Sequence, residues 1–298
     1  MAEVARFDIQ RFVQLSRAVD LSDLDWQAAA HHGISDDERR ILRYMADTEA
    51  HTILYLRDLL AGHTAHDPEV TAFLACWVYE ETHHGIALDR FLAEVGYPSS
   101  KNQYTRVAAG AAFAEEVEAF LSQSAAKLTP HFAAAHMAWG ALNEATAAAA
   151  YTALARTTGN PELAKLVTKL ARDERRHYSF YYHQADMRLR AHPLARFLCR
   201  SALNLFWGPV GIGVGGTREV IELIFARFFS DREGRAEIDR IEAQIRALPG
   251  QSAFSKLSQA RDRSLRGNHA MASITGVAHR LRFPQEAVSG EQRRRDFA

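Results

Sequence analysis

Apolar residues recur every three or four positions along most of the chain, which is the spacing of amphipathic helices packed on a core. Side-chain caps and prolines mark several helix starts, at Ser35, at Asp67-Pro68 and at Asn160-Pro161. The pattern predicts an all-α protein. We expect long helices over 35–60, 67–94, 105–127, from Thr129 onward and over 160–190, and shorter apolar ones over 194–207, 217–229 and 234–247.

Four of the long helices carry a glutamate inside an otherwise apolar stripe. These residues are Glu49, Glu81, Glu144 and Glu174. Helical steps of three and four place them in stripes with Leu42, Met45, Ile53, Leu56 and Leu60, with Trp77, with Met137 and Tyr151, and with Leu170 and Tyr181, respectively. A charged side chain on a buried face is costly unless it is paired or binds a metal ion. The four stripes therefore predict a metal site in the interior.

Two of these glutamates begin a Glu-x-x-His sequence, Glu81 with His84 and Glu174 with His177. Residues three apart lie on one face of a helix, so each pair can reach one ion. Two Glu-x-x-His helices and two further helices with one inward glutamate match the di-iron or di-manganese recipe of a four-helix bundle. Glu80 with His83 is an alternative register, but its helix face ends on a charge, so we prefer Glu81 and His84.

The predicted metal ligands are thus four carboxylates and two imidazoles. They are Glu49, Glu81, His84, Glu144, Glu174 and His177. Two divalent cations would balance the four negative charges, and imidazole suits iron. Two iron ions are the expected cofactor, with manganese as the alternative.

The residue patterns of both motifs resemble those of a known protein family. Residues 80–85 read Glu-Glu-Thr-His-His-Gly and residues 173–177 read Asp-Glu-Arg-Arg-His. They resemble the soluble acyl-carrier-protein desaturases among the ferritin-like di-iron carboxylate proteins. The resemblance implies a ferritin-like four-helix bundle with extra N- and C-terminal helices. The units expected are a helical lead-in over 1–34, the bundle over 35–192 and a C-terminal extension over 193–298.

The resemblance also implies roles for residues around the ions. Glu81 and Glu174 are the bridging candidates, and Asp173 would orient His84 from the opposite helix. The internal duplication suggests Glu80 as the matching partner of His177, unless Glu80 is simply a solvated residue.

The expected function is O2-dependent oxidation of an unactivated C–H bond in an acyl-type substrate. N-oxygenation or hydroxylation of a small molecule, and iron oxidation or binding of the ferritin kind, are the alternatives. The chain departs from the desaturases at Ala147, where they carry a threonine; the adjacent Thr146 lies on another helix face. The run Ala145–Ala150 indicates either close helix packing or room for oxygen or a substrate.

No flavin or iron–sulfur motif is evident, so a ferredoxin or a reductase is expected to donate electrons. An acyl carrier protein or a small-molecule substrate is the expected further partner. The basic groups that could receive an acidic carrier are Arg188, Arg190, Arg196 and Arg200.

Composition adds few constraints. Lys and Arg total 36, as do Asp and Glu, so net charge gives no argument for nucleic-acid binding. Cys76 and Cys199 form no disulfide framework, and the first residues lack a signal-peptide pattern, so a cytoplasmic location is expected. The sequence contains no uninterrupted apolar run of about 18 residues, so no membrane-spanning helix is expected.

The segments outside the bundle are also rich in apolar residues. Phe7, Phe12, Val13 and Leu15 could cover one end of the bundle, with Trp26 as an anchor. The helix over 217–229 is too apolar to remain exposed. It should pack on the bundle, form a homodimer interface or touch a lipid-like substrate; a homodimer is the expected assembly. The glycine-rich stretch over 208–216 reads as a connector, and the arginines 293–295 as a solvated tail.

Overall fold

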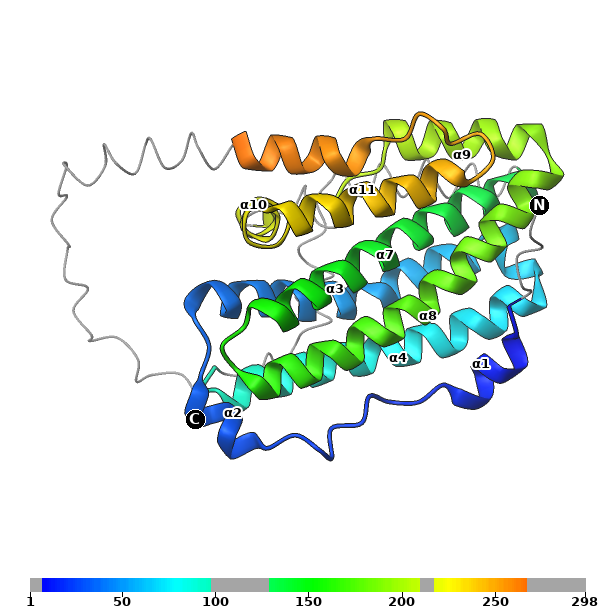
Figure 1. Cartoon of the computed structure of the whole chain (residues 1–298). Helices are drawn as coiled ribbons and strands as arrows, with labels where there is room; N and C mark the ends of the chain where they lie inside the picture. Colours follow the sequence, from blue (N-terminus) through cyan, green and yellow to red (C-terminus); the bar gives the residue numbers. More distant parts are fainter. Residues whose placement is uncertain (1–6, 98–128, 210–216, 267–298) are drawn as a thin grey trace, which may run out of the picture.

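A four-helix bundle forms the centre of the molecule (Figure 1). The computed structural model describes residues 7–97, 129–209 and 217–266. The described residues contain helices and no strand, which confirms the predicted all-α, ferritin-like fold. The bundle helices are α3 (Asp36–Leu60), α4 (Pro68–Glu94), α7 (Ala133–Thr157) and α8 (Pro161–Ala191). The helix expected over 105–127, most of the glycine-rich connector and the arginine tail lie outside the described residues.

The bundle helices begin where the sequence supplies a cap. Ser35 forms a reciprocal capping box with Glu38 at the start of α3, and Asp67 caps α4 ahead of a proline. Asn160 does more than cap α8, because its amide nitrogen also donates to the carbonyl oxygens of Ala29 and Gly33, at 2.9 Å each. This buried side chain therefore ties the N-terminal segment to the bundle.

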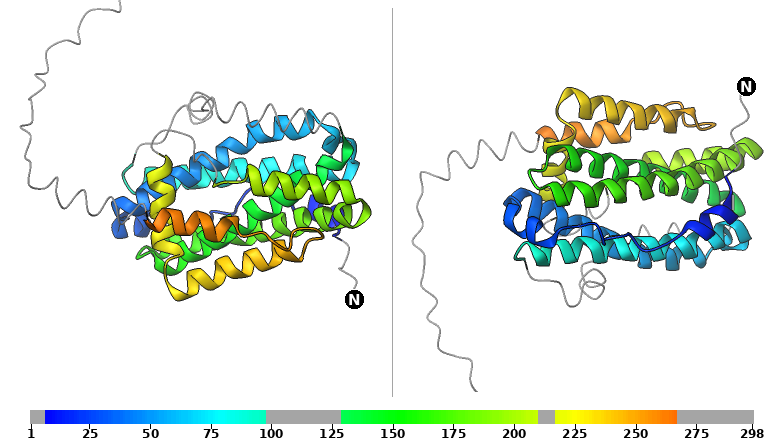
Figure 2. Two further views of the ribbon diagram at one scale, coloured as in Figure 1. Left: turned by 90° about the horizontal axis from the view of Figure 1, so that it is seen from above. Right: turned by 60° about the horizontal axis from the view of Figure 1, so that its bottom comes forward.

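Within the bundle α3 pairs with α4, and α7 pairs with α8 (Figures 1 and 2). Each pair comes close at a glycine. A Cβ atom on Gly140 would lie 2.5 Å from the Tyr181 ring, and one on Gly85 would lie 3.3 Å from the Cβ of Glu49. These glycines allow the paired helices to approach each other beside the predicted ligands.

The interior face of α3 follows the expected stripe only in part. Leu42 and Met45 are buried as predicted, but Ile53 and Leu60 are each 45 % exposed. Leu59 occupies the buried position near the end of the helix instead of Leu60. A step of three residues and a step of four both fit a 3.6-residue turn, so spacing alone could not choose between them.

The N-terminal segment runs along the face formed by α4 and α8 (Figure 2). It contains α1 (Ile9–Leu15) and α2 (Trp26–His32). Phe12 is buried against the bundle, but Val13 and Leu15 are exposed, so their predicted covering role is wrong. A single short helix can turn only one face inward. Trp26 packs against the core, and the guanidinium of Arg90 lies 4.2 Å from its ring centroid.

The C-terminal helices form a second layer over α7, in which α9 also contacts α8 and α10 also contacts α3 (Figure 1). They are α9 (Pro193–Leu205), α10 (Thr217–Phe228), α11 (Arg232–Ala247) and a helix over 256–266. Ile221, Phe225 and Phe228 of α10 are buried against the bundle, as one of the three sequence alternatives anticipated. Within the described part of the chain, no helix combines the length and the hydrophobicity that a membrane span requires.

Candidate metal centre

The six predicted ligands converge in the middle of the bundle. Their potential ligand atoms form two groups, each within 4.8 Å. The first group is Glu49, Glu81, His84 and Glu174, and the second is Glu81, Glu144, Glu174 and His177. None of these six residues is more than 6 % exposed. Glu81 and Glu174 belong to both groups, which is the arrangement expected of bridging carboxylates between two ions.

The structure also distinguishes the two registers of the first motif. Glu81 and His84 lie in the interior, whereas His83 is only partly buried and its Nδ1 lies 2.8 Å from the carbonyl oxygen of Tyr79. Glu80 is fully buried but points away from both ligand groups, toward an outer position described below. The structure therefore supports the preferred register.

Several polar atoms of the cluster make no hydrogen bond within the described residues. Glu81 Oε1, His84 Nδ1 and Glu174 Oε1 are all buried in this state. Buried polar atoms almost always have a partner, so each such atom needs an explanation. Carboxylate oxygens and imidazole nitrogens that converge without hydrogen bonds fit a site for two transition-metal ions. Their role as ligands stays a prediction.

Ionisation of all four carboxylates in this small buried space is energetically unfavourable. Burial raises the pKa of Glu81 well above its usual value, and repulsion from Glu174 and Glu49 raises it further. Burial and the charge of Glu174 likewise raise the pKa of Glu144. Burial alone would raise the pKa of Glu174, but the adjacent imidazoles of His177 and His84 lower it below its usual value.

The histidines respond in the opposite sense. Burial alone would lower the pKa of His84, but the neighbouring carboxylates of Asp173 and Glu174 outweigh burial and raise the pKa to about 10. Carboxylates around His177 have the same effect, so its pKa is also raised. The cluster thus retains protons to compensate its negative charge. Divalent cations can take over that compensation, with release of the protons.

Each histidine has a second carboxylate on its outer side. Asp173 Oδ2 lies 3.5 Å from Nε2 of His84, and Glu80 Oε2 lies 2.7 Å from Nε2 of His177. In both rings Nδ1 faces the ligand carboxylates. An outer carboxylate fixes the orientation of a ligating imidazole and raises its basicity. Glu80 is thus within hydrogen-bonding distance of His177, whereas Asp173 lies beside His84 without a hydrogen bond between them. That these carboxylates orient the histidines stays a prediction.

A single arginine joins the two outer carboxylates. Nη2 of Arg176 donates to both oxygens of Glu80 at 3.1 Å and to Oδ1 of Asp173 at 3.0 Å. The N-terminal segment adds two contacts here, because the backbone amide of Arg17 donates to Glu80 at 3.2 Å and Arg176 stacks over the Phe12 ring. The pattern Asp-Glu-x-Arg-His contains this arginine, but the sequence did not assign it a role.

Two aromatic residues that the sequence assigned to apolar stripes make polar contacts with ligands. The hydroxyl of Tyr151 donates to Oε1 of Glu49, and the indole of Trp77 donates to Oε1 of Glu144 at 3.0 Å. Tyr151 lies two helical turns after Glu144, and Trp77 lies one turn before Glu81. In the sequence, these contacts could have been anticipated only because a tyrosine and a tryptophan, each with a polar group on its ring, lie one or two helical turns from a predicted ligand.

The small residues beside Glu144 are placed as follows. Ala147 packs against the core, and the hydroxyl of Thr146 donates to the carbonyl oxygen of Leu142 at 2.8 Å. Thr146 thus uses its hydrogen on its own helix, and no hydroxyl replaces the threonine of the desaturases at position 147. The other wall of the cluster contains Tyr181, whose hydroxyl is buried and makes no hydrogen bond to any described residue.

Comparison with known proteins agrees with this geometry at the level of the superfamily. Residues 63–185 match the family model of rubrerythrin, a ferritin-like di-iron carboxylate family. That range holds five of the predicted ligands and leaves out Glu49 on α3. No curated protein and no solved structure matches the chain. The match does not confirm the desaturase-like subtype. Residues 63–185 therefore resemble the rubrerythrins, and the buried carboxylates and histidines of the bundle fit a di-iron site.

Proposed function

We propose that this protein is a non-haem di-iron oxidoreductase that uses O2 to oxidise an unactivated C–H bond of an acyl-type substrate. The observation that carries the proposal is the pair of overlapping ligand groups in the dry interior of the bundle. Iron ions bound there would supply the redox chemistry and react with O2, with electrons from a ferredoxin or a reductase. Manganese remains the alternative metal.

The protein's own residues hold this site rigid and dry. Asp173 and Glu80 orient the two imidazoles from outside, and Trp77 fixes one oxygen of Glu144. The phenol of Tyr151 holds a proton at Glu49 Oε1, where it can neutralise charge that changes during a redox cycle. Such preorganised polar groups stabilise charge in an interior that excludes water.

The acyl-type substrate is the finer part of the proposal, and the two motifs that resemble the desaturases support it. Docking of an acyl carrier protein has less support. Arg188 contacts Asp67 at 2.5 Å, Arg190 contacts Asp186 at 2.7 Å, and Arg196 donates to the carbonyl oxygen of Leu189 at 2.6 Å. Of the four arginines considered, Arg200 is the exposed one for which no such contact is seen among the described residues.

Metal content tests the centre itself. We expect about two iron ions per chain in the wild type, and loss of at least one in Glu81→Ala, because this residue belongs to both ligand groups. Glu94→Gln changes an exposed glutamate on the same helix and should keep the full metal content. A wild-type protein that binds no iron or manganese from anaerobic solution would refute the proposal.

The reaction is tested with reduced, iron-loaded protein, O2 and either an acyl carrier substrate or an arylamine, followed by mass analysis of products. Desaturation removes two hydrogens from the acyl chain while O2, two electrons and two protons give two waters. An added oxygen atom would favour the N-oxygenase or hydroxylase alternative instead. Oxidation of excess iron with no organic product would favour the ferritin-like one.

A further inference from the structure

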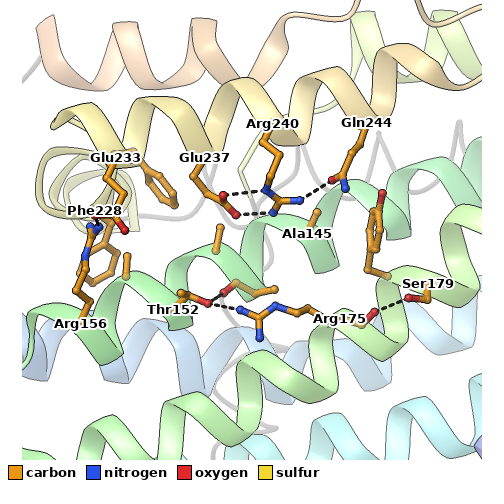
Figure 3. Close-up of a pocket in the computed structure, with 16 residues that line it drawn as sticks. Ala145, Thr152, Arg156, Arg175, Ser179, Phe228, Glu233, Glu237, Arg240 and Gln244 are labelled. Atoms are coloured by element: carbon orange, nitrogen blue, oxygen red, sulfur yellow. Dashed lines mark hydrogen bonds and ion pairs between the residues drawn. The ribbon is translucent and has the colours of Figure 1, made fainter.

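A cavity of about 480 Å³ lies between α7 and α8 of the bundle and α11 of the C-terminal layer (Figure 3), and none of the six predicted ligands lines it. Its floor consists of small residues on α7, among them Ala145, Ala148 and Ala149. Polar residues of α11 form its roof, including Glu237, Arg240 and Gln244 (Figure 3). The alanines on α7 thus make room for a ligand here, under α11.

Three arginines line the cavity, and two of them are neutralised by carboxylates. Arg240 donates to Glu237 Oε2 at 2.9 Å, and Arg156 pairs with Glu233. Arg175 differs: among the described residues it has no carboxylate within ion-pair distance, and its Nη2 donates to the hydroxyl of Thr152 at 2.7 Å. The guanidinium of Arg175 is therefore the cation of this cavity that is available to a ligand.

We propose that this cavity binds a small organic monocarboxylate with a compact apolar body. The carboxylate would pair with Arg175, since guanidinium and carboxylate match in shape and charge. The apolar body would lie on the alanines of α7. The volume is within the range of small-molecule sites, which combine an apolar lining with a few polar groups.

The charges around the cavity argue for a single negative charge on the ligand. Glu233 and Glu237 also line it, so a dianion such as a phosphate monoester would meet two carboxylates and one available guanidinium. Like charges at close range disfavour that arrangement. The apolar floor disfavours an ion without an organic body, because the alanines offer it no polar contact.

This site is separate from the metal centre, although it uses the same two helices. Arg175 follows the predicted ligand Glu174, and Ala148 lies one turn after Glu144, yet none of the six predicted ligands lines the cavity. The proposal does not depend on the reaction at the metals, so binding can be measured without turnover.

Isothermal titration of the full-length, metal-loaded protein with phenylacetate and hexanoate tests the proposal. We expect one saturable site per chain for at least one of them, and no comparable binding of phenylacetamide, hexanamide or inorganic phosphate. Arg175→Gln should weaken binding about tenfold or more, because a charge-assisted contact is lost. Arg175→Lys should weaken it less. Arg200→Gln, an exposed arginine on α9 outside the cavity, should bind as the wild type does.

A second variant tests the location. Ala149→Leu places a larger side chain in the floor and should abolish binding, with circular dichroism as the check that it folds. If Ala149→Leu fails to fold, the Arg175→Gln result decides. Absence of saturable binding up to about 10 mM would overturn the proposal. So would carboxylate binding that Arg175→Gln leaves unchanged, as expected for binding at the metal ions, or equal binding of the neutral amides.

Discussion

At the scale of single residues, the arrangement around the metal centre depends on Arg176. This half-buried side chain brings one nitrogen within hydrogen-bonding distance of three oxygens, two on Glu80 and one on Asp173. These two carboxylates lie on the outer sides of the two predicted histidine ligands, which we propose they orient. One arginine therefore supports both halves of the site, which otherwise share only the bridging candidates.

Arg176→Gln should weaken metal affinity by about 10- to 100-fold, the usual cost of disturbing residues that orient metal ligands. Without the cation, the two buried outer carboxylates repel each other and lose their fixed geometry. Competition with a chromogenic chelator measures the effect. Arg172→Gln is the matched control. Arg172 lies on the same helix but is largely exposed, and its Nε lies 3.9 Å from Oδ1 of Asp173, too far for a hydrogen bond. Equal affinities for the two variants would contradict this role.

A second residue-scale prediction concerns His136, which is buried at one end of α7. Its Nδ1 lies 2.9 Å from the hydroxyl of Thr64, and burial lowers its pKa to about 4. The unfolded chain, with a histidine pKa of about 6.5, binds this proton at a higher pH than the folded protein does. Stability from this group is therefore complete above about pH 6.5 and decreases as the pH falls toward 4.

Urea unfolding at pH 7.5 and pH 5 checks this sign. Between these pH values the wild type should lose about 2 kcal/mol more than His136→Gln, which cannot take up the proton. His83→Gln, which changes a partly buried histidine, is the control and should follow the wild type. If the wild type and His136→Gln lose the same free energy, the buried histidine is not responsible.

At the scale of elements, the close contact of α7 with α8 depends on Gly140. The Tyr181 ring fills the space that a side chain would need, and a Cβ atom would come within 2.5–2.8 Å of three ring carbons. Tyr181 is itself fully buried, so it has little room to move. The same ring also forms part of the wall beside Trp77, with 5.9 Å between the ring centroids.

Gly140→Ala should therefore lower the free energy of unfolding by about 1–2 kcal/mol. Overpacking costs roughly 1–3 kcal/mol, and the higher helix propensity of alanine offsets up to about 1 kcal/mol. Gly159→Ala is the control, because a Cβ atom there meets nothing within 4 Å, and its stability should change by less than about 0.5 kcal/mol. Denaturant unfolding of both variants measures the difference. Equal free energies of unfolding would show that the Tyr181 ring can shift to accommodate the added methyl group without loss of stability.

At the scale of the whole molecule, four carboxylates from four helices meet at one point. Their mutual repulsion opposes folding, and metal ions that bind only the folded bundle reverse it. Metal binding should thus act as a stabiliser of the whole fold. At a free metal concentration 100 times the Kd, the gain is about 2.7 kcal/mol.

Removal of the metal by a chelator should lower the Tm by about 4 °C, because the unfolding entropy is about 2.1 cal/mol/K per residue over 298 residues. Calorimetry of metal-loaded and chelator-treated protein measures the shift. In Glu81→Ala the shift should be much smaller, since the shared ligand is missing, while Glu94→Gln should retain it. A wild-type Tm that does not depend on metal would argue that the cluster is not a metal site.

The sequence by itself determined the helices, their caps and the residue types at the centre. Periodicity and caps are local properties, and Glu-x-x-His places two side chains on one helix face whatever surrounds it. For this reason the bundle helices and the six converging side chains could be named in advance. For Glu80 the duplicated motif left two interpretations, a partner of His177 or a solvated residue, and the structure buries it beside His177.

Only the tertiary structure decided the contacts between segments far apart in the chain. The Tyr151–Glu49 hydrogen bond joins residues 102 positions apart, and the cavity at Arg175 exists because α11 lies over α7 and α8. The exposure of Val13, Leu15 and Leu60 depended likewise on which neighbours cover each face. Helical spacing limits which residues share a face, but the packing of the other helices determines what that face meets.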